Sequence, residues 1–231
     1  MIGTPWIIKD YILGKSLSII DNTATVSKKA YSEMERERIR KELTERALAL
    51  FREKGIRDTG IEEIYVPIGI SKTFFYSFFD SKIALIQEVY RLQTEDMMET
   101  LRSNIWDYGS ENGLRETFRD MIDGRWYLAS IDDQMYLRSN MTAEEFGGYM
   151  NDRIILCAEV LNLAGIQVNR LDPRVFYNML MPIVWAGRSD PHSAPFLYTE
   201  AIRNSTEVQL DLLIGYMMSL SVNAEMGSRN G

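Results

Sequence analysis

Apolar residues recur at three- and four-residue spacing along most of the chain, which is the spacing of one helix face. Ser32 and Glu35 form a capping box before the first such stripe, and Gly55 supplies a left-handed residue after it. The pattern therefore predicts a helix from about Ser32 to Gly55. Its apolar stripe consists of Ile39, Leu43, Ala47, Leu50 and Phe51.

Two shorter helices are expected next. A second capping box, Thr59-x-x-Glu62, predicts that a short helix begins there. Pro67 disfavours helical geometry at the residue before it, so this helix ends early. Gly69 then allows a turn, and Ser71 is placed to cap a third helix.

The remaining periodic segments are longer and are separated by connectors that contain Gly, Asp, Ser or Pro. No segment alternates with period two in β-branched residues, so the pattern predicts an all-α fold of about nine helices. Residues 1–31 carry several apolar side chains and form an N-terminal extension that can be helical. The longer segments run from Lys82 to about Asn104, Leu114 to about Ser130, Ala143 to about Ala164, Pro173 to about Gly187, and Thr199 to about Leu220.

The third helix has two different faces. Lys72, Thr73, Tyr76 and Ser77 fall on one side of a helical wheel, and four phenylalanines at positions 74, 75, 78 and 79 fill the other. The polar groups can donate to phosphates and to base edges in the major groove of DNA. The same pattern also fits a short core helix with a polar exterior, but two short helices joined by a glycine turn favour a helix-turn-helix. The longer helix before them carries a basic flank, Arg36, Arg38, Arg40 and Lys41.

Five short motifs in this segment resemble the signature of the tetracycline-repressor (TetR) family. They are Phe51-x-x-x-Gly55, Thr59-x-Ile61-x-x-Ile64, Gly69-Ile70-Ser71-Lys72, Phe75-Tyr76-x-x-Phe79 and Ser81-Lys82-x-x-Leu85, in this order. The resemblance covers about residues 35–90. It implies a three-helix helix-turn-helix DNA-binding domain over residues 32–81 and a helical effector-binding and dimerisation domain over residues 82–231.

The resemblance also implies roles for individual residues. Lys72, Thr73 and Ser77 are expected to face bases or nearby phosphates, and Tyr76 and Lys82 are expected to contact the DNA backbone. The amide end of the second helix is expected to take another phosphate. The complete expected DNA-binding set is Thr59, Ser71, Lys72, Thr73, Phe74, Tyr76, Ser77 and Lys82.

Three departures from the family pattern bear on DNA affinity. Thr73 stands where glycine or proline is common, and Tyr65-Val66-Pro67 replaces a small, polar helix end. Phe74 stands where a small hydroxyl residue often touches phosphate, so it should weaken that contact or meet a thymine methyl group. An alternative to a DNA-binding regulator is therefore a TetR-like dimeric interaction module that has lost DNA binding.

TetR-like proteins use their later helices to bind a small effector and to pair two subunits, so that ligand occupancy changes the spacing of the two DNA-reading helices. An apolar or aromatic effector is expected, because aromatic and methionine side chains are dense in the middle region; they can also be plain core. The expected cavity residues are Trp106, Met121, Trp126, Tyr127 and Trp185. The expected homodimer interface, which can instead face its own core, consists of Phe176, Met179, Leu180, Ile183, Leu210, Leu213 and Met217.

Charge is distributed unevenly along the chain. The net charge is −7, yet residues 28–82 contain 12 Lys and Arg against 10 Asp and Glu, whereas the rest contains 14 against 23. The small positive excess therefore lies in the segment that is expected to bind DNA, although ordinary solvated helix faces produce similar margins.

The composition argues against an enzyme. The single histidine, His192, and the single cysteine, Cys157, are far apart, and the chain has no metal-ligand spacing and no nucleotide fingerprint. No catalytic residue, cofactor or metal is therefore expected. The N-terminus is not expected to be a signal peptide, and no apolar run approaches the roughly 18 residues of a membrane span. We expect a cytoplasmic, ligand-responsive regulator, a repressor by resemblance, that binds a palindromic double-stranded DNA operator as a homodimer.

Overall fold

The computed structural model describes residues 32–188 and 197–221, and the helices of these residues confirm the all-α prediction. Eight α-helices and two short 3-10 turns make up this part of the chain, with no strand in it. The expectations for the N-terminal extension and for His192 lie outside the described residues. Because Gly109 interrupts the longest helix, that helix consists of two helical segments, as the sequence predicts.

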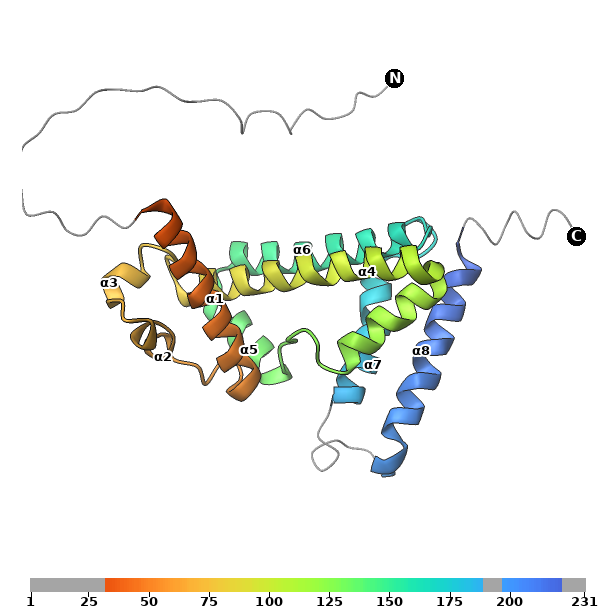
Figure 1. The fold of residues 1–231 in the computed structure, drawn as a ribbon. Coiled ribbons are helices and arrows are strands. Elements are labelled where there is room, and N and C mark those ends of the chain that lie inside the picture. Colours follow the sequence, from red (N-terminus) through yellow and green to blue (C-terminus); the bar gives the residue numbers. More distant parts are fainter. Residues whose placement is uncertain (1–31, 189–196, 222–231) are drawn as a thin grey trace, which may run out of the picture.

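The first three helices gather at one end of the molecule (Figure 1). They are α1 (Glu33–Lys54), α2 (Ile61–Tyr65) and α3 (Lys72–Phe75), with the 3-10 turn η1 (Val66–Ile68) between the last two. The N-terminus of α1 confirms its predicted capping box, since the Ser32 hydroxyl accepts the Glu35 amide at 3.2 Å. Gly55 and Gly69 have φ values of 84° and 79°, so both predicted turns use left-handed glycines.

The cap of α2 lies one residue later than the sequence predicts. Gly60 is the N-cap, and its amide donates to the Glu63 carboxylate at 2.9 Å. The Thr59 side chain is only 1% exposed, and its hydroxyl donates to the Gly55 carbonyl at 2.7 Å. The predicted box of Thr59 and Glu62 is therefore wrong, because the threonine closes the preceding turn instead of capping the helix.

The long helix α4 (Lys82–Ile122) connects the two ends of the molecule and turns sharply at Gly109, where φ is 77°. After this corner the chain lies very close to itself. A Cβ atom on Gly113 would lie 2.6 Å from the Ile105 amide nitrogen, so only glycine fits there. Asn104 also donates to the Thr117 hydroxyl across the corner at 3.0 Å.

Helix α5 (Ile131–Asn140) is absent from the sequence-based prediction, which continues the previous helix to Ser130. In the structure α4 ends at Ile122, and Ser130 instead caps α5 by accepting the Asp133 amide at 3.1 Å. The buried positions of α5 are Asp133 and Leu137 alone, whereas Ile131 and other apolar residues are exposed. Because its apolar residues form no buried stripe, periodicity does not reveal this helix.

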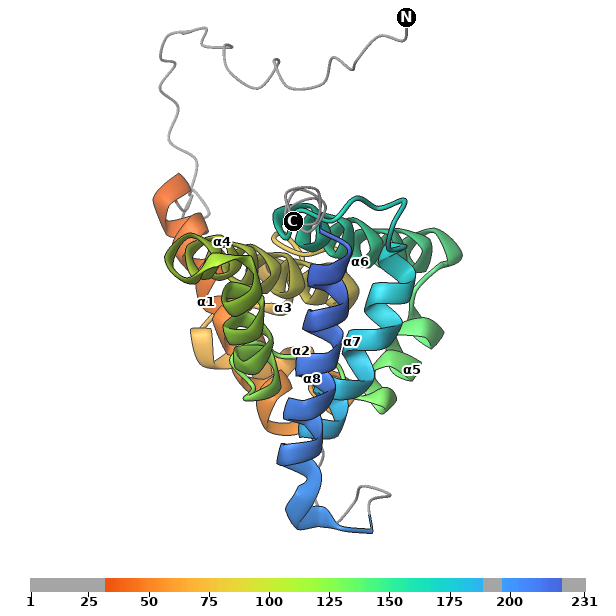
Figure 2. The ribbon, with the colours of Figure 1, turned by 90° about the vertical axis from the view of Figure 1, so that its right-hand side faces the viewer.

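The remaining helices form the other end of the molecule and agree with the predicted segments. They are α6 (Ala143–Leu163), α7 (Pro173–Arg188), the 3-10 turn η2 (Thr199–Ala201) and α8 (Ile202–Ser219). Helix α7 packs against α6 and α8, and α8 lies on the outside of the molecule, next to α7 (Figure 2). Asp172 caps α7 by accepting the Arg174 amide at 2.8 Å.

Two hydrophobic clusters stabilise these two ends. The first joins α1, α2 and α3 to the start of α4, and it extends to Leu137 of α5. The second lies between α4, α6, α7 and α8 and includes Phe118, Phe176 and Leu210. The boundary between residues 81 and 82 stays a prediction, and the core of the first three helices continues beyond it.

Candidate functional site

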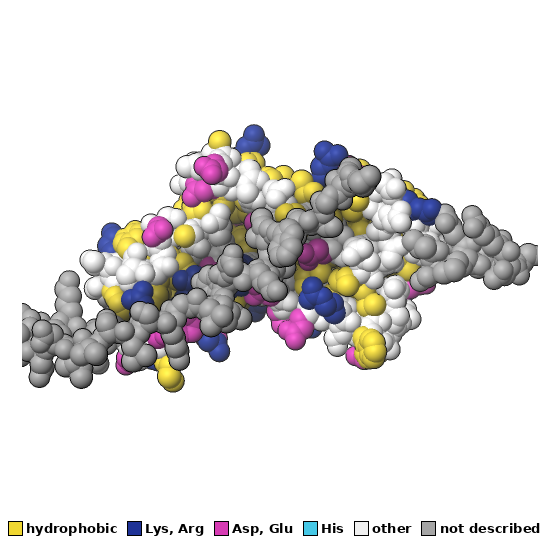
Figure 3. All heavy atoms as spheres, turned by 90° about the horizontal axis from the view of Figure 1, so that it is seen from above, with side chains coloured by type: hydrophobic (Ala, Val, Ile, Leu, Met, Phe, Trp, Pro, Cys, Tyr) yellow, Lys and Arg dark blue, Asp and Glu magenta, His cyan; other side chains and the backbone are white. Residues whose placement is uncertain are grey.

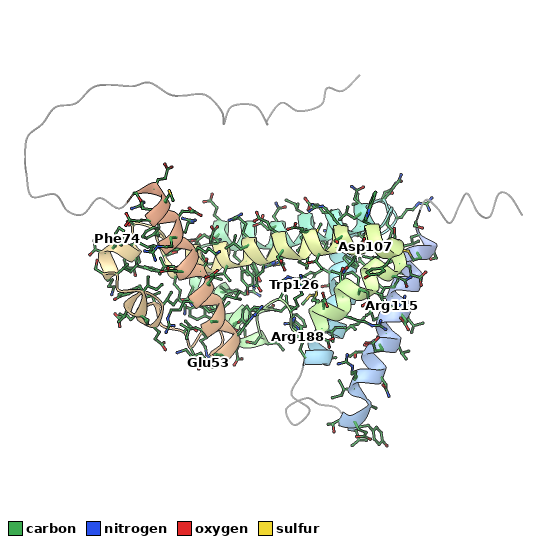
Figure 4. All side chains as sticks on the ribbon, viewed as in Figure 1. Glu53, Phe74, Asp107, Arg115, Trp126 and Arg188 are labelled. Atoms are coloured by element: carbon green, nitrogen blue, oxygen red, sulfur yellow. The ribbon has the colours of Figure 1, made fainter. Side chains whose placement is uncertain are left out.

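The polar face of α3 is exposed at the outer end of the molecule. Ser71 caps the helix by accepting the Phe74 amide at 3.2 Å. Phe75 and Phe79 are buried against α1 and α2, whereas Phe74, labelled in Figure 4, is half-buried. This arrangement leaves one polar surface, made of the exposed residues Lys72, Thr73, Tyr76 and Ser77.

The exposed side chains of this surface differ in the contacts that they already make within the protein. The Lys72 ammonium lies 4.0 Å from the Glu62 carboxylate, and both side chains are more than half exposed. Such an exposed pair contributes little, so the ammonium can exchange this partner for another anion. The Ser77 hydroxyl donates to the Phe74 carbonyl at 2.7 Å, which leaves its oxygen as an acceptor. The two side chains therefore offer a cationic donor and a neutral acceptor on one surface.

Two arginines of α1 hold the end of α3 in place. Arg36 lies over the Phe78 ring at 4.7 Å and donates to the Ser77 carbonyl at 3.1 Å. Arg40 lies over the Phe79 ring at 4.8 Å. The sequence indicates only a basic flank here. The four-residue spacing of these arginines places both on one face of α1, where each can stack on a phenylalanine that follows α3.

Two residues of the expected DNA-binding set face inward. Thr59 is buried, as described above, and cannot reach a phosphate. The Lys82 ammonium donates to the Ile56 carbonyl at 2.6 Å and lies 4.6 Å from the centre of the Tyr136 ring. Burial lowers the pKa of this ammonium, although nearby Asp133 favours its charged form. The Thr59 hydroxyl is therefore not available to DNA. Lys82 is half-buried, and its contact with the DNA backbone stays a prediction.

A comparison with known protein families decides the assignment of this region. Residues 43–89 match the family model described as bacterial regulatory proteins, tetR family. This segment is a TetR-type helix-turn-helix. The matched segment contains α2, α3, most of α1 and the start of α4, so it covers the exposed polar face described above. No curated protein and no solved structure gave a match.

Behind the helix-turn-helix, the protein has an inner cavity of about 90 Å³ between α4, α6 and α7. Three of the predicted cavity residues, Met121, Trp126 and Tyr127, line it. Trp185 lines a neighbouring cavity of about 500 Å³ instead. Trp106 is 89% exposed on the outer surface of α4, so its predicted place in the cavity is wrong. The four residues that line both cavities are Gln134, Tyr149, Arg153 and Tyr177.

The inner cavity contains two buried polar atoms that have no hydrogen-bond partner in the described part of the chain, the Tyr90 hydroxyl and the Gln93 Nε2. Each residue is only 8% exposed. The Gln93 Oε1 accepts a hydrogen bond from the Tyr127 amide at 2.7 Å, and this contact decides which end of the side-chain amide is Nε2. An unsatisfied buried donor costs about 1–3 kcal/mol, so these two groups can bind an acceptor that enters the cavity, either water or a ligand.

The cavity wall is connected to the helix-turn-helix through one buried carboxylate. The Tyr127 hydroxyl donates to Asp133 at 2.6 Å, and the other carboxylate oxygen accepts the Arg57 amide at 2.9 Å. Arg57 lies in the turn between α1 and α2. Burial and the Asp133 carboxylate both raise the pKa of Tyr127, so its hydroxyl remains a donor. The sequence does not indicate this link, since Arg57 lies 76 residues before Asp133 in the chain.

A further arginine fixes the connector that carries Trp126 and Tyr127. Arg188, at the end of α7, donates to the Trp126 carbonyl at 2.7 Å and through Nε to the Met121 carbonyl at 2.7 Å. Figure 4 shows Arg188 and Trp126 close together between α7 and this connector. Burial lowers the pKa of Arg188 to about 10, which leaves it charged at neutral pH. The connector is therefore held to α7 on one side and to Asp133 on the other.

The predicted dimer residues mostly face the core of their own subunit. Phe176 and Leu180 line the inner cavity, and Met179 alone among the seven is exposed. Periodicity identified the buried faces of α7 and α8 but not the partner that covers them. The wrongly predicted interface residues are Phe176, Leu180, Ile183, Leu210, Leu213 and Met217. The outer face of α8 instead exposes Val208, Leu212 and Tyr216.

The surface of the described residues carries charges of both signs (Figure 3). Seen from above, basic and acidic side chains are interspersed over the described surface (Figure 3). Among residues 32–188 and 197–221, no three His, Cys, Asp or Glu side chains come together as a metal-ligand group. None of the helices described here is long and apolar enough to cross a membrane.

Proposed function

We propose that this protein is a ligand-responsive transcriptional regulator of the TetR family, a repressor that binds a palindromic operator as a homodimer and is released by a small-molecule effector. The exposed polar face of α3 carries the proposal. It presents Lys72 and Thr73 on the helix that follows the turn of a TetR-type helix-turn-helix, and Tyr76 and Ser77 directly after that helix. The second helix of such a motif is the element that enters the major groove.

The dimer proposal rests on the outer face of α8. Val208, Leu212 and Tyr216 follow one another at four-residue spacing and are all exposed. An apolar row of this kind is suited to pairing with the same row of a second copy, because a two-fold interface is self-complementary. A palindromic operator has the same symmetry, so each subunit would read one half-site.

The DNA-binding proposal can be tested with the DNA upstream of the protein's own gene. Fluorescence anisotropy should give a nanomolar dissociation constant for a palindromic fragment and far weaker binding to a scrambled fragment of equal length. The affinity should fall steeply as salt increases, because phosphate contacts release counterions. Equally weak binding to both fragments would contradict the proposal and favour a TetR-like interaction module without DNA binding.

The proposed ligand response uses the link from Tyr127 through Asp133 to Arg57. A ligand in the cavity that moves Tyr127 would loosen the carboxylate that holds the turn before α2. Tyr127→Phe removes only the hydroxyl, so we expect amide exchange in the turn at residues 55–60 to become about ten-fold faster, which equals ~1.4 kcal/mol. Hydrogen-deuterium exchange with mass spectrometry measures this rate.

Tyr177→Phe is the matched control for this experiment. Tyr177 lines the same cavity but has no hydrogen bond to Asp133 among the described contacts. Its variant should leave exchange at residues 55–60 unchanged. The proposed link fails if the turn exchanges at the wild-type rate in both variants.

A further inference from the structure

The outer cavity is positively charged although the protein as a whole is acidic. Three arginines, Arg138, Arg153 and Arg174, line this cavity of about 500 Å³, and no Asp or Glu side chain lines it. The net charge of the chain is −7. A concave, basic surface on an acidic protein concentrates anions at that place.

Two of these arginines have no carboxylate partner among the described residues. Arg174 pairs with Asp172, whereas Arg138 and Arg153 form no ion pair in this part of the chain. Both instead lie over aromatic rings. The Arg153 guanidinium is 4.6 Å from the Tyr90 ring centre, and the Arg138 guanidinium is 5.9 Å from the Phe146 ring centre. The rings hold the guanidinium groups in place and leave their charge available to a ligand.

Arg153 also lines the inner cavity, where it is the single charged residue of the described lining. The two unpartnered polar atoms, the Tyr90 hydroxyl and the Gln93 Nε2, line the same cavity. All three groups can donate a hydrogen bond. The remaining wall is largely apolar and includes Met97, Leu101, Phe118, Phe176 and Leu180.

We infer that the effector is an amphipathic organic anion, namely an apolar molecule that carries one carboxylate. Its carboxylate accepts two parallel hydrogen bonds from Arg153, which lines both cavities, and its apolar body lies in the inner cavity and extends into the larger outer one. Tyr90 and Gln93 supply further donors beside the guanidinium. This inference rests on the proposed function, because it assigns the chemistry of the effector that the regulator would sense.

The test compares three probes with the same ten-carbon chain: decanoate, decanol and decylammonium. Isothermal titration of the full-length protein without DNA should show that decanoate binds at least ten-fold more tightly than decanol, and that decylammonium binds most weakly. The preference for decanoate should shrink as salt is added. Equal affinity for decanoate and decanol, or no binding of either, would overturn the inference.

Two variants test whether Arg153 causes the preference for decanoate over decanol. Arg153→Gln should bind decanoate and decanol equally. Arg174→Gln removes a charge from the same outer cavity, but one that Asp172 already neutralises, and should retain the preference. A preference that persists in Arg153→Gln would overturn the inference. If Arg153→Gln does not fold, as judged by circular dichroism, Tyr90→Phe replaces it and should weaken decanoate binding several-fold; unchanged binding in that variant would also overturn the inference.

This experiment separates the inference from the proposed function. Decanoate that binds through Arg153 but leaves DNA binding unchanged would support the anion site and contradict the proposed release mechanism. Release of DNA by a neutral or cationic compound, together with no preference for decanoate, would support the regulator and overturn the anion site.

Discussion

Phe75→Ala should lower the free energy of unfolding by about 3–5 kcal/mol and remove DNA binding, because the DNA-reading helix loses its anchor. Phe75 is fully buried, and its ring centre lies 5.8 Å from that of Tyr65 and 6.0 Å from that of Phe79. The helix has only four α-helical residues and does not hold its position without this contact. Urea unfolding followed by circular dichroism measures the loss.

Phe74→Ala is the control for this prediction, since it removes the same number of atoms from the adjacent position. Phe74 is half-buried and packs edge-on against Phe78. Its removal should cost about 1 kcal/mol, because part of the ring is already in contact with water. A larger loss for Phe74→Ala than for Phe75→Ala would contradict the assigned packing of α3.

Leu212→Glu should convert the proposed dimer into a monomer of 26.7 kDa and so weaken operator binding strongly. Leu212 is 70% exposed and lies at the centre of the apolar row on α8. In a two-fold interface the new carboxylate would lie close to its own copy, and both charges would be desolvated. We expect the dimer dissociation constant to rise at least 100-fold, which equals about 2.7 kcal/mol. Sedimentation equilibrium measures this constant.

Ile155→Glu places the same charge on an exposed apolar residue of α6, away from α8, and should leave the dimer intact. A wild-type protein that sediments as a monomer of 26.7 kDa would contradict the dimer proposal directly. A dimer that persists in Leu212→Glu would place the interface on another surface.

The helix-turn-helix was predictable because its signals are local. The capping box at Ser32 and the left-handed glycines at Gly55 and Gly69 each act within a few residues. The exposed polar face of this segment was also predictable from local sequence, because four phenylalanines at positions 74, 75, 78 and 79 mark the opposite, apolar face. Helix α5 was not predictable, since its buried positions are Asp133 and Leu137 alone and Asp133 is bound in part by Arg57, which lies far away in the sequence.

The errors among the site residues have one physical origin. Sequence spacing shows which side of a helix is polar or apolar, but not which surface covers it. Thr59 has the hydroxyl of a phosphate ligand, yet it is buried and donates to the Gly55 carbonyl inside the protein. Leu210 and Leu213 form an apolar stripe that their own subunit buries.

The cavity was predictable only in part. Met121, Trp126 and Tyr127, which the density of aromatic and methionine residues indicated, line the inner cavity, but the same criterion included the exposed Trp106. Arg153 gives no such signal in the sequence, because an arginine on a helix is usually a solvated surface residue. Its importance follows from the three-dimensional arrangement, which places it over the Tyr90 ring at the edge of an apolar cavity.

The most direct test of the central claim compares operator binding by the wild type and by Lys72→Ala/Tyr76→Ala. The matched control, Arg102→Ala/Tyr108→Ala, removes a cation and a phenol from exposed positions on α4. Measured by fluorescence anisotropy on the upstream DNA, the α3 variant should bind at least 30-fold more weakly, about 2 kcal/mol, with a smaller salt dependence, whereas the control should bind like the wild type. Equal affinity of the wild type and the α3 variant for this DNA would contradict the claim that α3 reads the operator.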